Sequence, residues 1–467
     1  MRLPSIILLL LLALFMSPAH ARLEGPQAWL PVDRGARQVR DLAQIRRDGV
    51  LRVLVNQSRN SSGEVKGEVV GVEYARLRAF EQFLNRDGHP GRSITLKIIP
   101  KAKDQLLAAL LRGEGDMVAP GERLGMPAGA ALSRSRAVVA EVPMVLVGRK
   151  GGMTYASLEQ LSGRSLALPA GSAAGPALAR LNESLLAKGR APVVIEWVDP
   201  SLAVEDVLEM VQAGIYPLTA VELTIAQRWA KVMPRLRIEQ KMTLGEKAGM
   251  HWFLPRETNM LQASVDRFLK EYRAPANQDA VFERVYRRLY RVQYPLDRTG
   301  RQRLDSVRTV LQRHAREQAF DWLNLAALAF KESTLNPAAR GASGAVGLMQ
   351  VTPATARSMG VGDVHRLENN VRASAKYLAS IRRQFFSSPR LNERERMAFV
   401  LAAYNLGPQR VQSMRAEARR RGLNADQWFF QVERVALESV GMGVVSYVNS
   451  VNKYYLAYAR ERYRLER

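Results

Sequence analysis

The pattern of apolar residues changes once along the chain, near residue 275, and this change limits the folds that the chain can adopt. Between about 50 and 275, short β-rich runs alternate with amphipathic helical stretches. Strands are expected at 51–55, 94–99, 142–147, 166–168 and 193–198, and helices at 74–85, 103–112, 175–188 and 203–213. Alternating strands and helices predict a largely parallel α/β sheet, and the repetition predicts two such lobes.

After residue 279 the pattern is almost entirely helical. Apolar residues recur at helical spacing in 281–292, 304–315 and 321–332, and the first of these helices carries a basic opposite face. The segment 272–278 separates the two patterns. We therefore expect an export signal at 1–21, an α/β half at 22–272 and a mainly α-helical half at 273–467.

The signal is expected from the first residues. Arg2 precedes an apolar run at 6–16, and the small residues Ala19 and Ala21 form an A-x-A cleavage signal. This run is shorter than the roughly 20 residues that span a bilayer. The segment predicts export with cleavage after Ala21, and an uncleaved N-terminal anchor is the alternative.

The chain is strongly basic, which bears on its partners. It has 69 Lys and Arg against 44 Asp and Glu, a formal charge of +25. Such a charge favours an anionic partner. For an exported protein we expect peptidoglycan or acidic lipid headgroups and no nucleic acid.

Composition also limits the chemistry. The chain has no cysteine. This excludes disulfides, thiol nucleophiles, iron–sulfur clusters and a cysteine-linked lipid anchor. Its five histidines are scattered without metal-ligand spacing: His20, His89, His251, His314 and His365. We therefore expect neither a cofactor nor a metal.

The α/β half resembles the family 3 periplasmic solute-binding proteins. The resemblance rests on the order and spacing of 48–53, 70–73, 161–167 and 170–172. It implies two lobes that close on a small ligand. The segments expected to bind the ligand depart from the family pattern. After Asp116, Arg123 is the only residue that could plausibly hold a ligand. Late in the second lobe, where an acidic ligand contact is expected, the acidic residue is Glu222. These departures predict an altered or lost ligand pocket, and fold-supporting charges are the alternative role for all three residues.

One carboxyl group stands out in the helical half. Helix 321–332 places Leu325, Leu328 and Ala329 on an apolar stripe that ends at Glu332. Burial beside apolar groups raises the pKa of a carboxyl group, as a general acid at neutral pH requires. A glycine-rich stretch at 341–353 follows, which allows close backbone approach to a ligand.

These residues resemble the catalytic core of the soluble lytic transglycosylase family, which has a goose-lysozyme-like fold. The matching motifs are Glu332-Ser333, Gly347-Leu348-Met349-Gln350, Asn370-Val371-x-x-Ser374-x-x-Tyr377-Leu378, Ala402-Ala403-Tyr404-Asn405-Leu406-Gly407-Pro408 and Tyr447-Val448. The resemblance implies Glu332 as the catalytic residue. It implies substrate-binding roles for Ser333, Ser343, Met349, Gln350, Tyr404, Asn405 and Tyr447.

Several alternatives remain within this resemblance. Core packing is the other role for Met349, and support of the helix end is the other role for Ser333. The family's serine nine positions after the glutamate is replaced by Gly341, and Ser343 is the candidate substitute.

The resemblance implies a lytic transglycosylase that cleaves between N-acetylmuramic acid and N-acetylglucosamine and leaves 1,6-anhydromuramic acid ends. An ordinary glycosidase needs two carboxylates. Glu368, Asp363 and Glu438 are candidates for the second, and solvated charges are the better interpretation of each. A hydrolase of the same fold and a silent exported binding protein remain alternatives, and endo versus exo cleavage stays open. The expected partners are glycan strands, a small ligand or muropeptide in the α/β half, and the periplasmic face of the outer membrane.

Overall fold

The computed structural model describes residues 39–58, 64–65, 68–69, 71–86, 93–127, 129–289, 293–341 and 344–467. The predicted export signal at 1–21 lies outside these residues. No helix in the described part is both long enough and apolar enough to cross a membrane.

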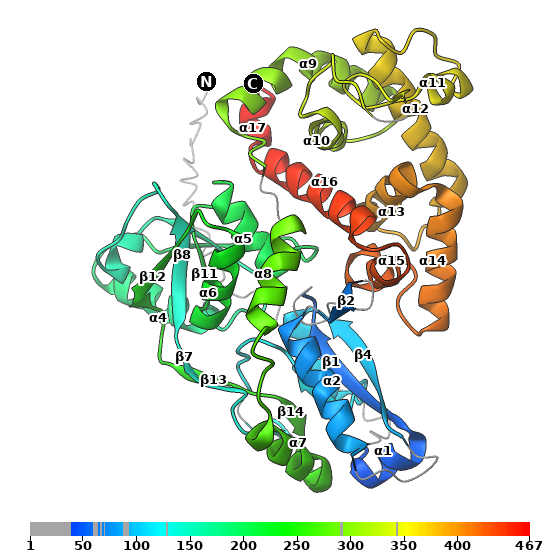
Figure 1. The fold of residues 1–467 in the computed structure, drawn as a ribbon. Helices are drawn as coiled ribbons and strands as arrows, with labels where there is room; N and C mark the ends of the chain where they lie inside the picture. The colour runs from blue at the N-terminus through cyan, green and yellow to red at the C-terminus, as the bar shows by residue number, and fades with distance from the viewer. Residues whose placement is uncertain are drawn as a thin grey trace, which may run out of the picture. The chain divides into compact units, whose positions relative to one another are not determined.

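The first lobe is built on a five-stranded sheet in the order β4-β1-β5-β14-β6. Its strands are β1 (Val50–Asn56), β4 (Thr95–Lys101), β5 (Met117–Ala119), β6 (Leu132–Arg134) and β14 (Phe253–Pro255). β1 pairs in parallel with β4 and β5, whereas β14 is antiparallel to β5 and β6. Helices α1 (Leu42–Asp48), α2 (Val72–Leu84), α3 (Leu106–Leu111) and α7 (Asn259–Glu271) belong to this lobe (Figure 1).

The second lobe repeats this plan in the order β10-β9-β11-β8-β12. Its strands are β8 (Met144–Arg149), β9 (Ser165–Leu168), β10 (Val194–Trp197), β11 (Thr219–Glu222) and β12 (Leu236–Thr243), and its helices are α4 (Gly175–Ala187), α5 (Val204–Gln212) and α6 (Leu223–Val232). β8 is antiparallel to both β11 and β12. The prediction of largely parallel sheets is therefore wrong in detail, because the segments that enter and leave each lobe pair antiparallel with it.

Two short strands join the lobes. β7 (Val139–Val142) leads out of the first lobe and β13 (Ala248–Met250) leads back to it, and the two pair antiparallel. Through these two strands the chain leaves the first lobe and returns to it.

Helix α8 (Gln278–Leu289) packs on the second lobe. The Trp229 ring centroid lies 4.9 Å from that of Phe282 and 5.0 Å from that of Tyr286, and all three side chains are buried in the lobe's core. α8 therefore packs with the α/β lobe although the sequence boundary assigned it to the helical half.

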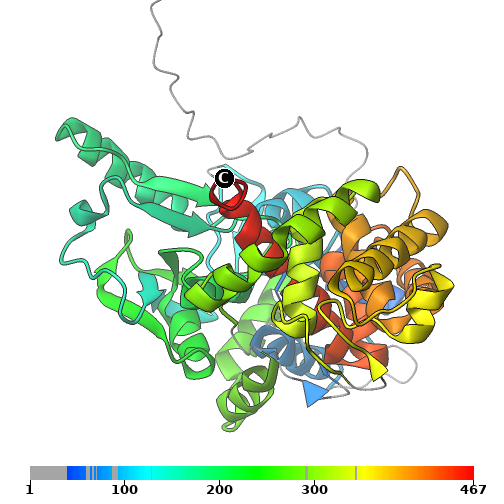
Figure 2. The same cartoon turned by 90° about the horizontal axis from the view of Figure 1, so that it is seen from above.

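The helical domain begins at α9. Its helices are α9 (Arg298–Glu317), α10 (Trp322–Ser333), α11 (Pro353–Ser358), α12 (Leu367–Phe385), α13 (Glu393–Leu406), α14 (Pro408–Arg420), the π-helix η4 (Trp428–Val432), α15 (Glu433–Val440), α16 (Met442–Arg460) and α17 (Arg462–Leu465). α10 is buried along most of its length within one apolar core. Seen from above, these helices, coloured from yellow-green to red, gather into one bundle (Figure 2). The predicted architecture of two α/β lobes followed by a mainly helical, lysozyme-like domain is confirmed.

Candidate active site

Glu332 lies in the last turn of α10. The helix begins at its N-cap Asp321, whose carboxylate accepts a hydrogen bond from the Leu323 amide at 3.1 Å. It ends at Ser333 because Thr334 and Leu335 have φ angles of 53° and 61°, in the left-handed region. Glu332 thus lies at the end of a buried helix, directly before the loop that leads to α11.

The Glu332 carboxyl group is partly buried and hydrogen-bonded. Burial raises its pKa above the usual value, while the hydrogen bond from the Tyr447 hydroxyl and the nearby Lys331 ammonium act in the opposite direction. Because burial prevails, the group retains its proton at higher pH than an ordinary glutamic acid. This property suits a general acid.

Tyr447 reaches Glu332 from α16. Its side chain is buried, and its hydroxyl donates to Glu332 Oε1. Burial first, and then the negative charge of Glu332, hold the pKa of the phenol well above its ordinary value. Tyr447 therefore remains a neutral donor that orients the carboxyl group.

Tyr404 supports the loop from α13. Its hydroxyl donates to the Met349 carbonyl at 3.0 Å and lies 3.2 Å from Ser374 Oγ. Burial raises the pKa of this phenol, and the Glu332 charge adds to the effect. Tyr404 is therefore a neutral group near Glu332 that also anchors the backbone of the loop.

The loop that follows α10 is tied down from two sides. Ser333 Oγ donates to the Leu348 carbonyl at 2.8 Å, and the Asn370 side chain accepts from the Met349 amide at 2.8 Å. The Met349 side chain is fully buried in the core, so the structure gives it a packing position. Gly347 has a φ of 78°, and a Cβ there would lie 2.4 Å from Asn370 Nδ2. Glycine is therefore required at this position.

Gln350 occupies the space next to Gly341. Its Nε2 donates to the Gly347 carbonyl at 2.9 Å, and its Oε1 lies 2.0 Å from where a Cβ of residue 341 would stand. A serine at 341 would have to displace this amide. Ser343, the proposed substitute, lies outside the described residues.

The remaining predicted groups lie elsewhere. Asn405 is exposed in the last turn of α13. Glu368 pairs with His314 at 2.7 Å, Asp363 accepts from the His365 amide at 3.0 Å, and Glu438 forms an ion pair with Arg421. Each of these three carboxylates is thus held by a partner other than Glu332 or Tyr447. Within the described residues, the site is therefore built around a single carboxyl group.

Two supporting residues were not assigned roles from the sequence. Asn370 and Ser374 are both buried on α12, and they hold the Met349 amide and contact the Tyr404 hydroxyl. Both belong to the motif that carried the resemblance, and their spacing of four places them on one helix face. That spacing was the sequence signal from which their supporting role could have been predicted.

The residues singled out in the α/β half are engaged within the protein. Asp116 accepts from the Arg40 and Arg52 guanidinium groups at 3.0 and 2.8 Å. The Arg123 guanidinium donates to the Val142 carbonyl at 3.1 Å, while the Arg123 amide donates to Glu222 at 2.7 Å.

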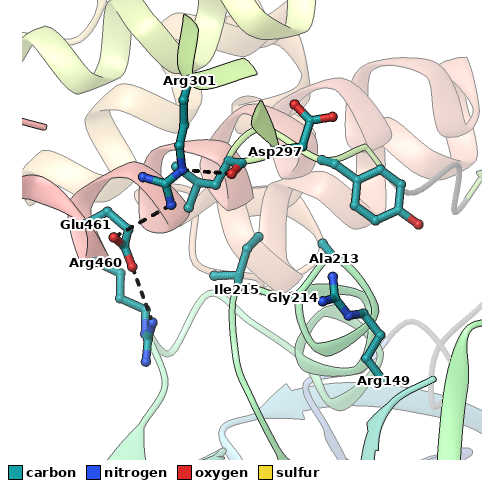
Figure 3. A pocket seen from close by; sticks show the side chains of 10 residues that line it. Arg149, Ala213, Gly214, Ile215, Asp297, Arg301, Arg460 and Glu461 are labelled. Atoms are coloured by element: carbon teal, nitrogen blue, oxygen red, sulfur yellow. Dashed lines mark hydrogen bonds and ion pairs between the residues drawn. The ribbon is translucent and has the colours of Figure 1, made fainter. Parts of the chain in front are cut away.

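A separate cavity of about 240 Å³ contains none of the predicted site residues (Figure 3). Its lining includes the guanidinium groups of Arg149, Arg301 and Arg460. The Glu461 carboxylate lies 3.8 Å from the Arg301 guanidinium. The Arg460 guanidinium forms an ion pair with Glu196 at 2.9 Å.

Residues 310–427 match the family model of the transglycosylase SLT domain. A membrane-bound lytic murein transglycosylase F of Desulfosudis oleivorans is 27% identical over 413 residues, covering 84% of this chain and 83% of that protein. A protein of the same name from Ectopseudomonas mendocina is 27% identical over 393 residues, covering 83% of this chain and 77% of its own.

Among solved structures, an ancestral arginine-binding protein bound to arginine is 17% identical with a TM-score of 0.39, covering 50% of this chain and 97% of its own. The substrate-binding protein of an amino acid ABC transporter is 18% identical with a TM-score of 0.38, covering 52% of this chain and 100% of its own.

Proposed function

We infer that this protein is a murein-degrading lytic transglycosylase, because it carries a transglycosylase SLT domain and is related over most of its length to membrane-bound lytic murein transglycosylases F. The observation that supports the activity best is the Glu332 carboxyl group, which has a raised pKa and a phenol donor beside it.

Glu332 acts first as acid and then as base. It protonates the glycosidic oxygen between N-acetylmuramic acid and N-acetylglucosamine, and the bond to that oxygen breaks. The resulting carboxylate takes the proton from the C6 hydroxyl of the muramic acid, whose oxygen closes the 1,6-anhydro ring. No water is consumed, so a second carboxylate to activate water is not needed.

The other residues position Glu332 and the loop. Tyr447 stabilises the carboxylate form by its hydrogen bond, and Tyr404 holds the Met349 backbone. Gln350 is partly exposed on the loop after Glu332 and is the candidate for sugar contact, together with Asn405. Ser333 and Met349 act through the fold of the loop.

The decisive experiment is digestion of purified sacculi by the wild type and by Glu332→Gln. General acid–base catalysis contributes roughly 10²–10⁴-fold to a rate, so we expect a loss of that order. Glu438→Gln, in the same domain but paired with Arg421, is the matched control and should keep wild-type activity. Unchanged solubilisation by Glu332→Gln would show that the residue is not catalytic.

Mass spectrometry of the released muropeptides separates the alternatives. A transglycosylase leaves anhydro ends, which are lighter by one water than the reducing ends left by a hydrolase. Reducing ends alone would identify a muramidase of this fold. Absence of any digestion by the wild type would favour a silent binding protein.

The proposal also includes a location and further partners. We propose that the protein acts in the periplasm, peripheral to the outer membrane, after removal of residues 1–21. The small ligand or muropeptide of the α/β half is part of this proposal, because the carboxyl ends of parallel strands in each sheet are where α/β proteins place ligands. Cell fractionation tests the location, and recovery in the cytoplasm would contradict it.

A further inference from the structure

Polar groups gather at the carboxyl ends of strands from both α/β lobes. Asn56 ends β1, Glu122 follows β5, and Glu222 ends β11. All three are at most 6% exposed. Buried carboxylates are costly unless a positive charge or hydrogen-bond donors compensate them.

The compensating charge comes from Lys103, which lies in the short helix η1 (Lys103–Gln105). Its Nζ lies 2.6 Å from Glu122 Oε2, and the Asn56 amide donates to Glu122 Oε1 at 2.6 Å. Burial by itself would lower the pKa of Lys103, but Glu122 and Glu222 outweigh it and raise that pKa above its ordinary value. The side chain is therefore a buried, charged ammonium group.

The two lobes meet around this group. The Arg123 amide of the first lobe donates to Glu222 of the second at 2.7 Å, and Ser58 Oγ donates to Glu205 at 3.0 Å. Gly171 lies so close to Asp104 that a Cβ there would stand 2.7 Å from the Asp104 amide nitrogen. Groups of both lobes thus lie around the buried Lys103 side chain, and the space that this side chain fills between them is termed the cleft.

We infer that this cleft is a binding site for a primary ammonium group, and that Lys103 of the chain itself occupies it as an internal ligand. A primary ammonium fits because it is a compact charge with three donors, and the cleft offers two carboxylates. An external amine must displace the Lys103 side chain to bind. The inference concerns the α/β half alone and does not depend on the catalytic proposal.

The first test empties the site by Lys103→Ala. The truncated atoms, three carbons and the nitrogen, correspond to n-propylammonium. We expect this probe to raise the Tm of the variant saturably, by about 2 °C or more, and to leave the wild type unchanged. Tetramethylammonium has no N–H donor and should have no effect on either protein.

Two variants serve as controls. Lys101→Ala removes a lysine two residues away whose side chain is 33% exposed and pairs with Glu114 at 2.6 Å, and it should not respond to the probe. Lys103→Ala/Glu122→Gln removes the carboxylate and should lose the response. A folded Lys103→Ala variant that ignores propylammonium, or a wild type that responds equally, would overturn the inference.

A second measurement uses the wild type, so it does not depend on the folding of a variant. Reductive methylation followed by mass spectrometry reports how fast each lysine reacts. We expect Lys103 to react at least about tenfold more slowly than Lys101, because a buried and protonated amine is not nucleophilic. Equal rates would contradict enclosure of the Lys103 ammonium. Neither measurement depends on catalysis. A negative result in either one would therefore leave the proposed activity, which the sacculus experiment tests, unaffected.

Discussion

At the scale of single residues, the proposed mechanism depends on how Glu332 balances two opposing influences. Burial raises the pKa of its carboxyl group, and the Tyr447 hydroxyl lowers it by stabilising the charged form. A residue that must first give and then take a proton needs both influences. A permanently charged carboxylate could not donate the proton, and a permanently neutral carboxyl group could not accept one.

Tyr447→Phe removes the hydrogen bond and leaves most of the burial. The pKa of Glu332 then rises further, so the protonated acid persists to higher pH. We expect the alkaline limb of the kcat/KM profile to move upward by about one pH unit, the equivalent of one hydrogen bond to a charged group. Tyr463→Phe, on an exposed tyrosine, should leave the profile unchanged. A limb that stays in place or moves down would contradict the assigned role of Tyr447.

Gly341→Ser tests the packing of the loop. The new Cβ would displace the Gln350 amide, which loses its bond to the Gly347 carbonyl, so we expect a stability loss of about 1 kcal/mol by urea unfolding. Gly362→Ser has open space around it and should cost little. In the Gly341→Ser/Gln350→Ala double variant the added penalty of the serine should disappear. A persistent penalty would locate the strain elsewhere.

At the scale of elements, the position of α8 decides where the α/β half ends. Its aromatic residues Phe282 and Tyr286 pack against Trp229 of α6, so the helix completes the core of the second lobe. Hydrophobic periodicity showed that this segment is a helix with one apolar face. It did not show which core that face would cover.

Phe282→Ala opens a cavity against Trp229, and truncation of a buried phenylalanine typically costs about 3–5 kcal/mol. We expect hydrogen exchange to accelerate in α6 and α8, with α9 and α10 unaffected. Val440→Ala, at a position that is 40% exposed, is the control. Faster exchange in α10 but not in α6 would assign α8 to the helical domain instead.

At the scale of the whole molecule, the charge of +25 bears on how the protein is retained on its substrate. At the proposed periplasmic location, that charge would face the carboxylates of the cell wall. Attraction between exposed charges weakens with salt, since the Debye length falls from about 14 Å at 0.05 M to about 4 Å at 0.5 M.

Retention on sacculi should therefore fall several-fold over that range of ionic strength. Glu332→Gln is the form to use, because it should bind without digesting the sacculus. Co-sedimentation measures the bound fraction, and chitin, which is uncharged, provides the comparison. Binding that is insensitive to salt would show that the net charge does not contribute to retention.

The site could be predicted from the sequence only where the prediction depended on local order. Glu332 was identifiable as the candidate acid because helical periodicity and the adjacent motif lie within a few residues of it. The alternating strand–helix pattern and the helical pattern were also identifiable, because each repeats within a short stretch of sequence. The predicted roles of Glu332 and of the substrate-binding residues, Ser343 and Asn405 among them, stay predictions.

The sequence by itself therefore determined the order of the elements, the two α/β lobes and the helical domain, and it supplied the candidate acid. The tertiary structure alone decided which strands pair antiparallel, that α8 joins the second lobe, that Met349 is buried and that Lys103 fills the cleft. It also brought Tyr447 to Glu332, across 115 residues of chain. The physical reason is that periodicity reports which face of an element is apolar, whereas the choice of its partner depends on packing between distant segments.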